Sequence, residues 1–90
     1  MTINKRIRVL GEVQGVLFRK STLEKARQLS INGWVKNESD GSVLAEIEGT
    51  SQAVSMMEDW LRVGPKDARV SEIIVEEGKE KGYRDFEIIR

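Results

Sequence analysis

Two glycines four residues apart, Gly11 and Gly15, separate a strand-like pattern from a helix-like pattern. Before them, residues 5–10 alternate charged and apolar side chains, which predicts a strand with one buried face that carries Ile7 and Val9. After them, residues 21–31 carry apolar side chains at helical spacing. Because glycine adopts positive φ at no steric cost, the chain can turn tightly between the two elements. A strand followed at once by a helix is therefore the first constraint on the fold.

The rest of the chain repeats this alternation of strand and helix. The patterns predict a helix over residues 21–31, strands over 33–37 and 42–48, a second helix from Thr50 or Ser51 to Gly64-Pro65, and strands over 68–76 and 85–89. The order is β-α-β-β-α-β plus a short terminal strand. It predicts an α+β, ferredoxin-like split β-α-β fold, with two helices on one face of a mainly antiparallel sheet. Ninety residues suit one domain, residues 1–90.

Several local features of these elements can be predicted from side-chain chemistry. Ser21 or Thr22 is expected to cap the first helix, with Glu24 completing a capping box, and Asn32-Gly33 is expected to end it. The expected apolar face of the second helix is Ala53, Met56, Met57, Trp60 and Leu61. On the 42–48 strand, Val43, Ala45 and Ile47 are expected to face the core, and Leu44, Glu46 and Glu48 to face outward. The acidic pairs Glu46 with Glu48 and Glu76 with Glu77 are expected to be solvated, as are Lys66 and Asp67.

Composition excludes several classes of function. Lys plus Arg equals Asp plus Glu at 15 each, so no global field attracts nucleic acid or an anionic membrane. The absence of Cys and His removes the thiol nucleophile, the usual general base and the usual metal ligands, so no metal or cofactor is expected. Residues 1–6 lack the apolar stretch of a signal peptide, and no run approaches transmembrane length. The expected compartment is the cytoplasm.

The connection between the first strand and the first helix is suited to bind an anion. A curled run of backbone N–H groups forms a concave nest with positive potential, and a helix N-terminus adds free N–H groups. Arg19 supplies a planar fork of donors that matches two phosphate oxygens. For the glycines and the arginine alone, a tight turn with a solvated Arg remains the alternative.

The stretch Gly11-Glu12-Val13-Gln14-Gly15-Val16-Leu17-Phe18-Arg19 resembles the signature of the acylphosphatase family. The family's second motif follows at Gly33-Trp34-Val35-Lys36-Asn37, with Asp40-Gly41-Ser42-Val43 next. The resemblance runs from about Arg6 to Ile89. It implies an acylphosphatase-like domain that hydrolyses acyl phosphates, the mixed anhydrides of a carboxylic acid and phosphoric acid.

The resemblance also implies the residues of the site. The family's catalytic arginine corresponds to Arg19 and its catalytic asparagine to Asn37; for Asn37 alone, a strand-end turn residue is the alternative. Substrate binding is expected from Gln14, Gly15, Val16, Leu17, Phe18 and Arg19, mainly through backbone amides. The expected partner is a small-molecule acyl phosphate, bound by a monomer.

Two residues depart from the family pattern. Leu17 is bulky at a position that is often small, and is expected either to narrow the entrance for the acyl group or to face the core. Glu38 is expected to place a negative charge near the anion and weaken its binding. The rival functions are an RNA-binding module, which would need exposed aromatic side chains and a basic surface, and a domain that binds phosphate compounds without turnover.

Overall fold

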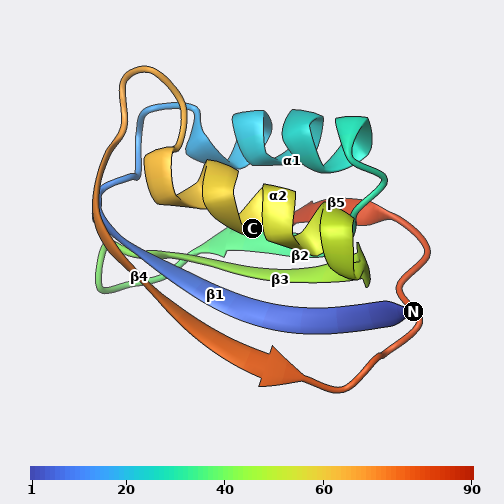
Figure 1. The fold of residues 1–90 in the computed structure, drawn as a ribbon. Helices are drawn as coiled ribbons and strands as arrows, with labels where there is room; N and C mark the ends of the chain where they lie inside the picture. Colours follow the sequence, from blue (N-terminus) through green and yellow to red (C-terminus); the bar gives the residue numbers. More distant parts are fainter.

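A computed structural model describes residues 1–90 as a five-stranded sheet with two helices on one face (Figure 1). The elements in chain order are β1 (Thr2–Glu12), α1 (Phe18–Gln28), β2 (Asn32–Asn37), β3 (Val43–Thr50), α2 (Ser51–Val63), β4 (Arg69–Gly78) and β5 (Phe86–Ile89). The strand order is β4-β1-β3-β2-β5. Only the β2–β5 pair is parallel; the other three pairs are antiparallel. The predicted ferredoxin-like α+β fold is confirmed.

The hydrophobic core fills the space between the helices and the sheet. Alternate residues of the central strands are fully buried, among them Ile7 and Val9 on β1 and Ala45 and Ile47 on β3, as their alternation predicts. The helices contribute Ala26, Val54, Met57 and Leu61 to the same cluster. The prediction for Met56 was wrong, because its side chain is 48% exposed and Val54 takes the inner position on α2.

Helix α1 begins three residues earlier than the pattern predicts, at Phe18, and the expected Ser21 or Thr22 cap is wrong. The residue at the N-cap is Leu17, which makes no capping hydrogen bond, while the Thr22 hydroxyl donates to the Phe18 carbonyl inside the helix at 2.7 Å. Packing explains the early start: the Phe18 ring is buried and lies 5.9 Å, centroid to centroid, from Trp60 of α2. Tertiary contact thus outweighs capping chemistry at this end.

The other end of α1 also differs from the prediction. The helix ends at Gln28, and Ser30 takes the left-handed conformation with φ of 57°, so the chain turns before Asn32-Gly33 is reached. Asn32 and Gly33 then start β2. Thr50 does cap α2, since its hydroxyl accepts from the N–H of Ala53 at 3.1 Å.

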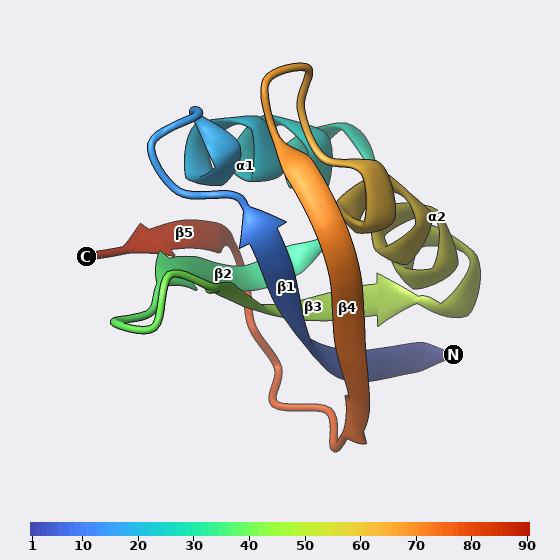
Figure 2. The same cartoon turned by 90° about the vertical axis from the view of Figure 1, so that its left-hand side faces the viewer.

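The outward face of β3 is covered, so the prediction that Glu46 and Glu48 are solvated was wrong. Strands β4 and β5 occupy opposite edges of the sheet, and the segment that joins them must cross it (Figures 1 and 2). On its way, the N–H groups of Lys81 and Tyr83 donate to the Glu48 carboxylate at 2.6 and 2.9 Å, and the Lys81 ammonium donates to Glu46 at 2.6 Å. Both carboxylates are buried.

The remaining charged residues singled out from the sequence, Glu76, Glu77, Lys66 and Asp67, are exposed as predicted. Neither helix has the length and apolar character needed to cross a lipid bilayer.

Candidate active site

The loop between β1 and α1, residues 13–17 (the connecting loop), forms a curled stretch of main chain. Gly15 has φ of 75° and Leu17 has φ of 61°, so two left-handed residues alternate with Val16. Backbone in such a conformation turns successive N–H groups toward one side and forms an anion-binding nest. The N–H groups of residues 15–20 donate no hydrogen bond within the protein, which leaves them free for a ligand.

Gly11 belongs to the strand rather than to this loop, contrary to the expectation from sequence. It lies in β1 opposite Val70, at a register shift in the β1–β4 pairing, with φ of 127°. A Cβ atom at this position would collide with the backbone of Arg69 and Ser71. Close approach of β4 therefore explains this glycine, whereas the turn itself depends on Gly15.

Arg19 and Asn37 come from different elements and line the same cleft. Arg19 is the second residue of α1, and Asn37 is the last residue of β2. Strands β1 and β2 both pair antiparallel with β3, so they run in the same direction. The C-terminal ends of both strands therefore lie on the same side of the sheet. This arrangement brings the start of α1 beside the end of β2, as the fold prediction requires.

The cleft has a volume of about 300 Å³ and carries positive charge. Neither the Arg19 guanidinium nor the Asn37 amide is engaged in an ion pair or side-chain hydrogen bond, and no Asp or Glu side chain lines the cleft. The lining residues are Val13, Gly15, Leu17, Phe18, Arg19, Lys20, Asn37, Ile88 and Arg90. A cleft with three cationic side chains and free backbone N–H groups is suited to hold a dianion.

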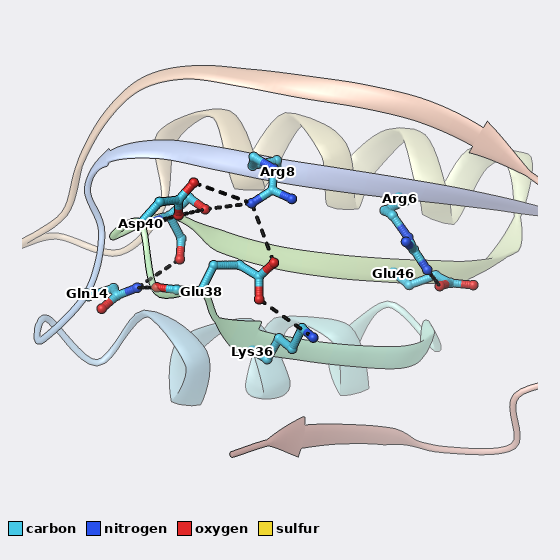
Figure 3. Close-up of polar contacts among 8 residues, drawn as sticks. Arg6, Arg8, Gln14, Lys36, Glu38, Asp40 and Glu46 are labelled. Atoms are coloured by element: carbon cyan, nitrogen blue, oxygen red, sulfur yellow. Dashed lines mark hydrogen bonds and ion pairs between the residues drawn. The ribbon is translucent and has the colours of Figure 1, made fainter.

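Gln14 does not line the cleft, and its side chain is engaged elsewhere. Its side-chain amide donates to the carbonyl groups of Glu38 at 2.8 Å and Ser42 at 2.9 Å, on the turn between β2 and β3 (Figure 3). The side chain thereby ties the connecting loop to the turn that directly follows Asn37. Val16 packs against the core and does not line the cleft. Of the six residues expected to bind substrate, Gly15, Leu17, Phe18 and Arg19 line it.

The same turn is held from the other side by a cluster of charges around Arg8 (Figure 3). The Arg8 guanidinium donates to the Ser42 hydroxyl at 2.9 Å and lies 3.6 Å from the Glu38 carboxylate and 3.8 Å from that of Asp40. Hydrogen bonds from the Ser42 hydroxyl and N–H, with Arg8 nearby, lower the pKa of the Asp40 carboxyl group. The Glu38 carboxylate also pairs with Lys36 at 3.6 Å. Two cations therefore balance Glu38, and its side chain does not line the cleft.

Comparisons with known proteins agree on one family. The acylphosphatase family model matches residues 5–88. A curated acylphosphatase of Paraburkholderia xenovorans is 50% identical over 82 residues, which cover 90% of this chain and 84% of the relative. The chain belongs to the acylphosphatase family. Its members hydrolyse acyl phosphates, so the activity inferred from the two motifs is confirmed at the level of the family.

Solved structures support the same assignment. The acylphosphatase of Coxiella burnetii superposes with a TM-score of 0.94 at 38% identity, covering 98% of this chain and 93% of that chain. The acylphosphatase of Bacillus subtilis gives a TM-score of 0.95 at 34% identity and covers all of both chains.

Some cleft residues of this acylphosphatase were not predicted from sequence. Ile88 and Arg90 reach the cleft because β5 pairs in parallel with β2, with Ile88 opposite Val35. The strand order would have placed the chain end near Asn37, but the sequence pattern alone does not give that order. In the described chain, no group of three or more Asp or Glu side chains is arranged to hold a metal ion.

Proposed function

We propose that this cleft is the active site, where the connecting loop and Arg19 hold the phosphoryl group and Asn37 orients the attacking water. The observation that supports the proposal best is the set of unused donors: the backbone N–H groups of residues 15–20 and the Arg19 guanidinium have no partner in the protein. Gly15 and residues 17–20 border the same cleft as Asn37.

Hydrolysis of an acyl phosphate needs little general acid–base catalysis. The leaving group is a carboxylate, whose conjugate acid has a pKa of about 4, so it needs no strong general acid. The reaction needs a fixed phosphoryl group, neutralised charge on its equatorial oxygens and a water in line with the leaving oxygen. The N–H groups and the bidentate Arg19 fork meet the first two needs.

Asn37 meets the third need. Its side-chain amide offers one acceptor and two donors, which can fix the orientation of a water molecule. The water oxygen forms the new bond to phosphorus as the bond to the acyl oxygen breaks, which yields phosphate and a carboxylate. Because Asn cannot act as a base at neutral pH, the proton of the water passes to a phosphate oxygen or is released late.

Steady-state hydrolysis of benzoyl phosphate tests these roles. Arg19→Ala and Asn37→Ala are each expected to lower kcat/KM by about 10²–10³, the usual cost of removing one well-placed donor. Arg27→Ala is the matched control, since it removes an exposed cation from the other end of the same helix. If both cleft variants remain folded by circular dichroism and keep the activity of the control, the proposal is wrong.

We also propose that residues 1–90 act as one domain and as a monomer on a small-molecule acyl phosphate in the cytoplasm, with no nucleic acid or membrane partner. The balance of 15 basic and 15 acidic side chains supports the absence of polyanionic partners. Light scattering should give the monomer mass of 10.2 kDa. A mass near twice that value would contradict the proposed monomer, and salt-dependent binding to RNA would contradict the proposed absence of a nucleic acid partner.

A further inference from the structure

The backbone conformation and the exposure of Leu17 are both unfavourable for a leucine. Its backbone is left-handed, with φ of 61° and ψ of 26°, and its side chain is 72% exposed. A non-glycine residue in this conformation carries steric strain, which Gly or Asn would relieve. The side chain buries little surface in return and caps nothing at the start of α1. Folding therefore gains little from a leucine at this position.

Leu17 lines the cleft and is not part of the hydrophobic core or of the residues packed against it. Four apolar residues line the cleft, but Val13 and Phe18 are buried and Ile88 is half-buried, so Leu17 offers the largest exposed apolar surface there. The backbone of the same residue belongs to the nest. A ligand held by the nest therefore occupies the cleft that Leu17 lines.

We propose that Leu17 contacts the acyl group of the substrate and makes the enzyme prefer acyl phosphates with a large apolar acyl group. This inference rests on the proposed function. When N–H groups and the Arg19 guanidinium occupy the phosphoryl oxygens, the acyl group is the part of the substrate left to meet the apolar lining. An aromatic or branched aliphatic group would cover the exposed Leu17 side chain and remove apolar surface from water. An acetyl group is too small to cover it to the same extent.

The test compares benzoyl phosphate with acetyl phosphate on Leu17→Asn and Leu17→Gly. Asn is close in size to Leu and tolerates the left-handed backbone, but it is polar; Gly tolerates the backbone and has no side chain. Val63→Asn is the matched control, because Val63 is 71% exposed, lies at the C-terminal end of α2 and does not line the cleft.

In both Leu17 variants, the ratio of kcat/KM for benzoyl phosphate to that for acetyl phosphate should fall about fivefold, mainly through the KM of benzoyl phosphate. The constants for acetyl phosphate should change less than those for benzoyl phosphate, because an acetyl group covers less of the Leu17 side chain. The urea midpoints should not fall below that of the wild type, since strain is relieved.

Two results would overturn the inference: an unchanged ratio, or an equal loss for both substrates, which would mean that Leu17 acts through the shape of the loop. Failure of the proposed function looks different. In that case Arg19→Ala leaves both the turnover and the inhibition by phosphate unchanged, whatever the Leu17 variants do.

Discussion

Replacing Glu46 by Gln should remove much of the protein's sensitivity to acid. The Glu46 side chain is buried under the segment that crosses the sheet, and it accepts hydrogen bonds from Lys81, Asn4 and Arg6. Burial by itself raises the pKa of the carboxyl group. These donors lower the pKa by more than burial raises it, so the pKa falls from an ordinary value of 4.5 to about 2. The folded state therefore holds the carboxylate form more strongly than the unfolded chain does.

The size and the pH range of the effect follow from this shift. A lowered pKa in the folded state stabilises the protein above the unfolded-state value of 4.5, and the stabilisation is lost as the pH falls toward 2. A shift of this size corresponds to about 3 kcal/mol at pH 7. By linkage, about 2 kcal/mol of it is lost between pH 7 and pH 3. For a small domain, that loss moves the urea midpoint by about 1–2 M.

Urea denaturation between pH 7 and pH 3 measures this contribution. Fluorescence of Trp34 is a suitable probe, since its indole N–H donates to the hydroxyl of Tyr83 in the crossing segment at 3.1 Å. Glu46→Gln should be less stable than the wild type at pH 7. The difference in free energy of unfolding between the two proteins should become smaller by about 2 kcal/mol at pH 3. Glu72→Gln, which removes an exposed carboxylate without an ion pair, should follow the wild-type curve. If this difference in free energy of unfolding stays constant with pH, Glu46 does not stabilise the fold through its lowered pKa.

Three further substitutions test the packing of the sheet and the positioning of the site. Gly33→Ala should lower the free energy of unfolding by more than about 3 kcal/mol, because φ is 136° and a Cβ atom would collide with the Glu46 carbonyl of β3. Gly41→Ala, with open space around it and φ of 92°, should cost only about 1–2 kcal/mol in urea denaturation. Gln14→Ala should lower kcat for benzoyl phosphate about 10- to 100-fold, because the connecting loop loses both hydrogen bonds to the turn after Asn37. A kcat within twofold of the wild type would show that this tie does not position the site.

The fold could be predicted from sequence because its elements carry strong patterns. Alternation on β1 and β3 identified the buried residues Ile7, Val9, Ala45 and Ile47, and Gly64-Pro65 marked the end of α2. Six elements in the order β-α-β-β-α-β then restrict the topology to very few arrangements. The start of α1 was missed because burial of the Phe18 ring, a tertiary effect, decides it.

Glu46 and Glu48 show the limit of pattern reasoning most clearly. Alternation correctly separated them from the core-facing residues, but it cannot say what covers the opposite face of a sheet. The covering segment lies more than thirty residues further along the chain, and its path follows from the positions of β4 and β5 at opposite edges. The cleft residues Ile88 and Arg90 were missed for the same reason, since only the strand order brings them to Asn37.

The most direct test of the proposed site is a crystal structure of the protein grown with inorganic phosphate. We expect a phosphate in the connecting loop, about 2.7–3.1 Å from several backbone N–H groups of residues 15–20 and from the Arg19 guanidinium, with a water held by Asn37. A phosphate bound elsewhere, with the N–H groups of the loop directed away from a common point, would contradict it.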